Sequence, residues 1–132
     1  MRYEIGIAAR SSHIVWIHGP FAAGHWNDLK IFRKTLKKVL AKHHEKAICD
    51  GIYRGEERRA EAKYDPNLTK AQRKFNKQAL ARHETLNQRI KKFNTMNTVW
   101  RHSHEKHRIA FTAIISLLEV DLAFSPLFDV VE

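Results

Sequence analysis

The first twenty residues constrain the fold most, because their apolar positions follow the two-residue period of β-strands. Residues 2–9 alternate, which places Tyr3, Ile5 and Ile7 on one face of a strand. A short turn leads into the β-branched and aromatic segment 14–18, which ends near Gly19-Pro20. The sequence therefore predicts an N-terminal β-hairpin.

The rest of the chain predicts one mixed α/β domain over residues 1–132. Asn27 or Asp28 is a suitable N-cap for the first helix, and Thr69 for the second. KAICD is short and apolar enough to be a central strand. In chain order the predicted elements are a helix over about 29–43, a strand over 46–50, an irregular segment over 54–68, a helix from 69 to about 93, a loop over 95–104 and a helix over about 105–123.

The charge is strongly positive and unevenly distributed. The chain has 24 Lys and Arg against 14 Asp and Glu, and all of these bases precede residue 113. This distribution favours a polyanionic partner, nucleic acid before an anionic membrane, although a solvated basic surface without a partner is the alternative. A single cysteine fits a reducing compartment, and Glu119 and Asp121 interrupt the longest apolar stretch. We therefore expect an intracellular protein with no membrane span.

Two acids stand out against the basic background. Asp50 ends the predicted third strand, and Glu84 is the only acid among eight bases between residues 69 and 93. Helical spacing places Glu84, Asn87 and Lys91 on one face. Acids from a strand end and a helix, flanked by bases, suit two-metal phosphodiester chemistry. Alternatively, Asp50 caps a turn and Glu84 forms surface ion pairs, and the spacing taken alone favours this second interpretation.

Three segments in order resemble one known family: residues 3–33, CDGIYRG at 49–55 and ARHETLNQRIKKF at 81–93. They resemble the catalytic domain of DDE-type transposases, in particular the PIF/Harbinger-like DDE superfamily endonucleases. The matching positions are Gly19, Pro20, Gly24 and Asp28 in the first segment, Asp50, Tyr53 and Gly55 in the second, and Arg82, Glu84 and Lys91 in the third.

The resemblance implies an RNase H-like fold with a mixed sheet flanked by helices. It implies that Asp50 and Glu84 are catalytic acids that ligate Mg²⁺ or Mn²⁺ in a two-metal site, with DNA as substrate and the nucleus as location. The residues then expected to contact DNA are Tyr53, Arg54, Arg82, Asn87, Arg89, Lys91 and Lys92.

The chain departs from the family pattern at its beginning. The family's first catalytic Asp lies on a strand before the segment RYEIGI, so the domain is expected to be N-terminally truncated and catalytically impaired. An unpaired sheet edge then predicts self-association. Without a helix-turn-helix, targeting would require a separate DNA-binding protein. The alternatives are a non-catalytic nucleic-acid-binding module based on the helix at 70–92, and a decayed transposon remnant.

Overall fold

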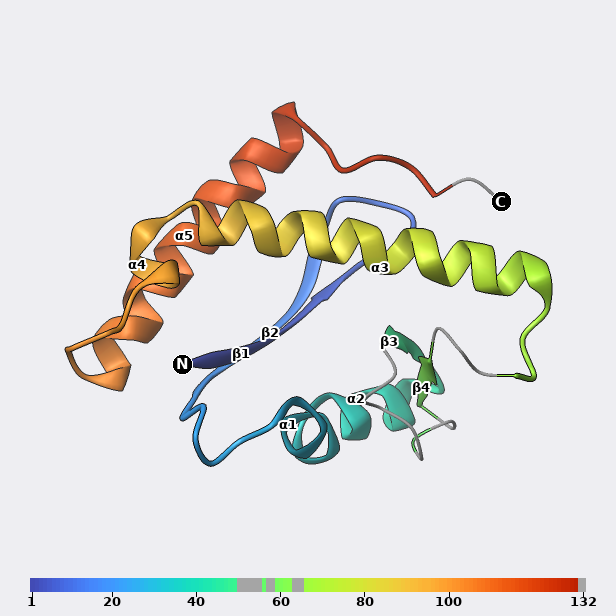
Figure 1. Cartoon of the computed structure of the whole chain (residues 1–132), viewed down its shortest axis with the longest axis horizontal. Coiled ribbons are helices and arrows are strands. Elements are labelled where there is room, and N and C mark those ends of the chain that lie inside the picture. Colours follow the sequence, from blue (N-terminus) through green and yellow to red (C-terminus); the bar gives the residue numbers. More distant parts are fainter. Residues whose placement is uncertain (50–55, 57–58, 63–65, 131–132) are drawn as a thin grey trace.

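The computed structural model describes residues 1–49, 56, 59–62 and 66–130 and has a mixed α/β architecture, as the sequence predicts (Figure 1). The elements in chain order are β1 (Arg2–Ile7), β2 (Ile14–Phe21), α1 (Asp28–Lys34), α2 (Leu36–His43), β3 (Ala47–Cys49), β4 (Ala60–Ala62), α3 (Lys70–Lys91), α4 (Asn94–Asn97) and α5 (His104–Phe124). The predicted loop at 95–104 therefore overlaps a short helix. None of the described helices is long and apolar enough to cross a membrane.

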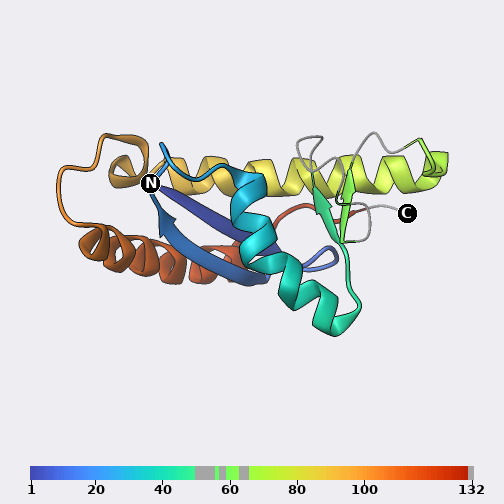
Figure 2. The same cartoon turned by 90° about the horizontal axis from the view of Figure 1, so that it is seen from below.

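The predicted hairpin is confirmed. β1 and β2 are antiparallel, with Ile5 opposite Ile17. The face of β1 that carries Tyr3, Ile5 and Ile7 packs against the main core, as the alternation predicts. That core comes from α3, α5 and the segment after α5, and its buried members are Leu86, Ile90, Phe111, Ile114, Ile115, Leu118, Leu122 and Leu127. The opposite side of the hairpin faces α1 and α2 (Figure 2).

The single helix predicted over 29–43 is wrong, because Thr35 separates α1 from α2. Thr35 has φ −121° and ψ −92°, outside the helical region. Its Oγ1 lies 2.6 Å from Glu4 Oε1 and 2.7 Å from the Ile31 carbonyl oxygen. The break thus attaches the helix junction to β1. Asn27 is the N-cap of α1, since its Oδ1 accepts a hydrogen bond from the Lys30 amide at 2.8 Å.

The predicted third strand exists, but it is not central in a sheet that includes the hairpin. β3 pairs in parallel with β4, with Ala47 opposite Ala60, and the described strands form two separate two-stranded sheets. β4 lies in a segment that the sequence predicts as irregular. A strand of three residues is too short for a readable period, so only the pairing reveals it.

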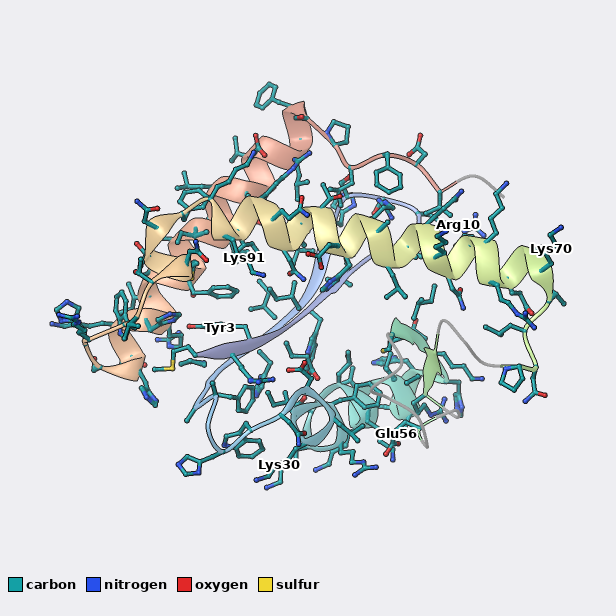
Figure 3. All side chains as sticks on the ribbon, viewed as in Figure 1. Tyr3, Arg10, Lys30, Glu56, Lys70 and Lys91 are labelled. Atoms are coloured by element: carbon teal, nitrogen blue, oxygen red, sulfur yellow. The ribbon has the colours of Figure 1, made fainter. Side chains whose placement is uncertain are left out.

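A second core supports this small sheet. Phe32, Leu40 and Ala60 are buried together, and Leu36 and Ala47 pack against them. Nearby, the buried Glu56 carboxylate pairs with Arg33 Nε at 2.5 Å and with Lys37 Nζ at 2.5 Å. The carboxylate thereby connects both helices to the segment before β4 (Figure 3).

The long helix α3 begins where its capping signal predicts. The Thr69 side chain accepts from the Gln72 amide at 3.2 Å, and the Gln72 side chain accepts from the Thr69 amide at 2.8 Å. This reciprocal capping box satisfies two donors at the helix start. α5 is capped by Ser103, whose Oγ accepts from the Lys106 amide at 3.3 Å.

Candidate active site

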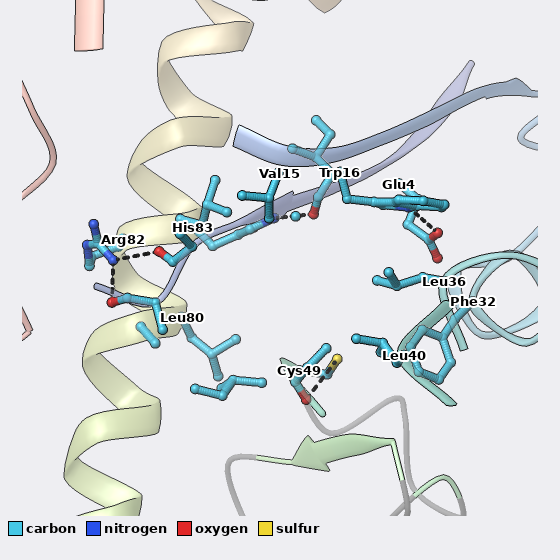
Figure 4. Close-up of a pocket in the computed structure, with 18 of the residues that line it drawn as sticks. Glu4, Val15, Trp16, Phe32, Leu36, Leu40, Cys49, Leu80, Arg82 and His83 are labelled. Carbon is cyan, nitrogen blue, oxygen red and sulfur yellow. Dashed lines mark hydrogen bonds between the residues drawn. The ribbon is translucent and has the colours of Figure 1, made fainter. Parts of the chain in front are cut away.

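A cavity of about 860 Å³ lies between the two sheets. β1 borders it on one side and β3 on the opposite side, while α1 and α2 face α3 across it (Figure 4). Phe32, Leu36 and Leu40 line the wall of the first two helices, and Leu80 and His83 line the α3 wall. The cavity is thus bordered by α3, which carries Glu84, and by β3, which ends one residue before Asp50.

Glu84 and Asn87 both line this cavity from α3, as their helical spacing predicts. Glu84 is exposed, and no hydrogen bond or ion pair reaches its carboxylate from the described residues. An open carboxylate of this kind fits a hard divalent cation. Lys91 does not line this cavity, but it lines a second cavity of about 470 Å³ together with Asn87, which is consistent with the helical spacing of these two residues.

Asp50, Tyr53 and Arg54 lie outside the described residues. The residue before Asp50 is informative. Cys49, the last residue of β3, lines the same cavity as Glu84. The strand end that leads to one predicted acid and the helix that carries the other therefore border one space.

Asn87 and His83 form a polar chain along the α3 wall. His83 Nε2 lies 2.9 Å from the Ile5 carbonyl oxygen, and Asn87 Nδ2 lies 3.3 Å from His83 Nδ1. A carbonyl oxygen only accepts, so Nε2 donates to it, and Nδ1 is placed to accept from the Asn87 amide. This hydrogen bond gives Asn87 a structural partner, His83, in addition to its position on the cavity.

Arg82 corrects the DNA-contact prediction, because its side chain is buried with 1% exposure. Its guanidinium donates to the Ala8 carbonyl at 3.1 Å, the Ala9 carbonyl at 2.7 Å and the Ser11 carbonyl at 2.6 Å. These bonds bind the turn of the hairpin to α3. A guanidinium enclosed in this way has no surface to offer a DNA phosphate.

The other predicted DNA-contacting bases have two different environments. Arg89 is largely covered and donates to Asp121 Oδ2 at 3.1 Å and to the Ser125 carbonyl at 2.7 Å. Lys91 and Lys92 are exposed at the end of α3. Lys91 and Lys92 are therefore better placed than Arg89 to meet a polyanion.

Two of the matching positions in the first segment, Gly19 and Asp28, have structural roles. Gly19 has φ +144°, and a Cβ there would lie 2.7 Å from Tyr3 Cδ1. Gly19 precedes Pro20 through a cis peptide bond in β2. Gly24 has open space around it. Asp28 opens α1 and pairs with Arg2 Nη1 at 2.8 Å.

Glu4 is a cavity-lining acid that the sequence pattern does not single out. Its Oε1 accepts from Trp16 Nε1 at 2.7 Å and lies near the Thr35 hydroxyl, while its buried Oε2 has no hydrogen-bond partner among the described residues. Its position in an alternating strand resembles that of any outward-facing acid, so no local signal marks it. Within the described ranges, no three His, Cys, Asp or Glu side chains gather as a metal site.

Comparison of the chain with protein-family models, curated proteins and solved structures finds no match.

Proposed function

We propose that the chain is a DNA-binding domain of the DDE-transposase type, with an RNase H-like ancestry and a divalent-metal-dependent activity on phosphodiester bonds. The observation that carries this proposal is the shared cavity: Glu84 lines it from α3, and Cys49, the residue before Asp50, lines it from β3. The sequence resemblance assigns these same two elements to the catalytic acids.

The order of elements also supports the proposal. An antiparallel hairpin, a helical segment, a parallel strand pair and long helices follow one another, and this order is compatible with an RNase H-like domain. The separation of the hairpin from the β3–β4 pair is the main departure from a single mixed sheet.

The chain's own residues divide the proposed chemistry between them. Glu84 and Asp50 would hold Mg²⁺ or Mn²⁺ through carboxylate oxygens, the ligands that these hard cations prefer. Bound divalent cations neutralise phosphate charge and polarise the attacking oxygen. Lys91 and Lys92, exposed at the end of α3, would hold the DNA backbone.

Nicking of supercoiled plasmid in the presence of Mg²⁺ or Mn²⁺ tests the activity. Asp50→Asn and Glu84→Gln should each reduce the metal-dependent rate at least about tenfold, because each removes a cation ligand while keeping side-chain volume. Glu119→Gln is the matched control, since Glu119 is an exposed acid on α5. Cleavage that survives both substitutions unchanged would refute the assignment of these acids.

A non-catalytic nucleic-acid-binding module is the second candidate, and the exposed bases at the end of α3 favour it. It predicts DNA binding without added metal, with a steep salt dependence. Replacing Lys91 and Lys92 by Met should lower the slope of log K against log salt by about two, if each contacts one phosphate. Arg89→Met should change the slope less, because Asp121 already pairs with it. Equal slopes for all variants would exclude binding through this end of α3.

A further inference from the structure

Helix α5 is apolar on two sides, and one of them is exposed. Its inner side packs into the main core. Its outer side carries large apolar side chains that are more than half exposed: Ile109 (58%), Leu117 (59%), Val120 (59%) and Phe124 (87%). Figure 2 shows α5 along one edge of the molecule. Because a helix that is apolar all round is typical of a buried position, the outer side of α5 is expected to have a second neighbour.

The exposed residues form one continuous row along the helix. The row Ala110, Ala113, Leu117, Val120 and Phe124 follows intervals of three, four, three and four residues. This is the spacing with which two helices pack side by side. Ile109 borders the row at its N-terminal end, and we call these six residues the outer stripe. At 1.5 Å per residue the outer stripe is roughly 22 Å long, which is enough for a helix-to-helix contact over several turns.

The apolar area of the outer stripe is sufficient for a small specific interface. If an aliphatic side chain exposes about 100 Å² and an aromatic one about 200 Å², the four large residues leave roughly 350 Å² exposed on each copy. Two copies would then bury roughly 700 Å² through these residues. Since apolar atoms make up about 60% of a typical interface, the total is roughly 1,200 Å², at the lower end of the range for stable dimers.

Side-chain size favours a second copy in an antiparallel orientation. The outer stripe has its small residues, Ala110 and Ala113, toward the N-terminus of α5 and its largest residue, Phe124, at the C-terminus. If two copies cross near Leu117 and run antiparallel, each Phe124 meets the two alanines of the other copy. A parallel pair would place two Phe124 side chains against each other. Large side chains opposite small ones allow the two rows to interdigitate.

Charge favours the same orientation. The first half of α5 carries Lys106 and Arg108 against Glu105, whereas the second half carries Glu119 and Asp121 and no base. Lys106 also lies at the N-terminal end of the outer stripe. An antiparallel pair places this lysine near the acidic end of the other helix, and it brings opposite ends of the two helix dipoles together. A parallel pair would bring like charges together.

We propose that the outer stripe of α5 is a self-association surface, at which two copies of this chain pair through α5 in an antiparallel, two-fold arrangement. The proposal does not rest on the proposed DNA-binding or nuclease function, because it uses α5 alone. It also differs from association through a strand edge, since no strand contributes to the contact.

Sedimentation of the chain of residues 1–132 from about 1 to about 200 μM tests the association, because dimerisation depends on protein concentration. We expect the dimer fraction to rise over this range. Leu117→Glu should lower the association constant at least about 100-fold, because it places two carboxylates in the apolar centre of the contact. Val99→Glu is the matched control, since Val99 is 83% exposed and lies outside α5, and it should change the constant less than about twofold.

Thermal melting at low concentration, followed by circular dichroism, checks that the variants fold. Both substituted side chains are exposed, so both variants should melt close to the wild type. If Leu117→Glu does not fold, Val120→Lys provides the same test one turn further along the outer stripe.

Disulfide cross-linking determines the orientation in a Cys49→Ser background. Chains with Ala110→Cys and chains with Phe124→Cys should cross-link to each other when mixed, and neither should cross-link to itself. Phe124→Cys chains that cross-link to themselves would refute the antiparallel arrangement.

Two sedimentation results would overturn the proposal. A wild-type chain that stays monomeric over the whole range would mean that a different partner, or a segment beyond these residues, covers the outer stripe. A dimer that persists unchanged in Leu117→Glu and Val120→Lys would mean that another surface, such as a strand edge, associates.

Discussion

Replacing Arg82 with methionine tests whether this residue supports the fold or contacts DNA. Methionine keeps most of the buried stem but removes the guanidinium, so the hydrogen bonds to the Ala8, Ala9 and Ser11 carbonyls are lost. Hydrogen bonds to a charged donor contribute about 1.5–3 kcal/mol each. The three share one donor group and their turn lies near solvent, so we expect a total loss of about 3 kcal/mol.

The free energy of unfolding from urea denaturation, followed by circular dichroism, measures this loss. For a chain of this size, about 3 kcal/mol corresponds to a fall of roughly 10 °C in Tm. Lys92→Met is the matched control, since Lys92 is an exposed base just after the same helix and should change stability by less than about 0.5 kcal/mol.

DNA binding should show the opposite pattern. Lys92→Met should weaken binding at low salt, whereas Arg82→Met should leave the affinity of the folded fraction unchanged. The structural role of Arg82 is refuted if Arg82→Met lowers the free energy of unfolding by less than about 1 kcal/mol while weakening DNA binding.

Three other substitutions test parts of the fold. Gly19→Ala should destabilise the chain by about 1–3 kcal/mol in urea denaturation, because its φ is +144° and its Cβ would meet Tyr3, whereas Gly24→Ala, in open space, should be nearly neutral. Hydrogen bonds from Lys37 and Arg33 lower the pKa of Glu56, so its stabilisation is complete above the unfolded value of 4.5 and is lost as pH falls through the lower folded pKa. Glu56→Gln should flatten this acid limb of the Tm–pH curve, and an unchanged limb would contradict the role of these bonds. Burial lowers the pKa of His107 from 6.5, so the unfolded chain binds more protons and Tm should fall as pH drops below about 6.5. His107→Gln should remove that component, and a wild-type Tm that is constant between pH 8 and 5.5 would argue against it.

Tyr3 shows how a strand position predicted from alternation acquires a specific environment. Burial raises its pKa to about 12, and its hydroxyl lies 2.6 Å from His107 Nδ1. Its ring also stacks on Phe111, with centroids 3.6 Å apart. The alternation of residues 2–9 indicates the inward face of the strand, but it contains no information about the histidine 104 positions away.

The candidate site likewise combines positions that helical spacing predicts with neighbours that it does not predict. Helical spacing predicts that Glu84 and Asn87 share a face, and both line the main cavity. The same spacing includes Lys91, which lines a second cavity together with Asn87, so Asn87 borders both cavities where α3 passes from one group of neighbours to another. Helical periodicity specifies direction around an axis and not the neighbour at each turn.

The hairpin, the long helix with its Thr69 cap and the mixed α/β class follow from the sequence alone. These features depend on residue periods and on side chains that reach the backbone within a few positions. The three-dimensional structure is needed to show that β3 pairs with β4 in a separate sheet, that Thr35 breaks a helix to contact Glu4, and that Arg82 is enclosed by the hairpin turn. Those outcomes depend on contacts between distant segments, where burial and hydrogen bonding outweigh local preference.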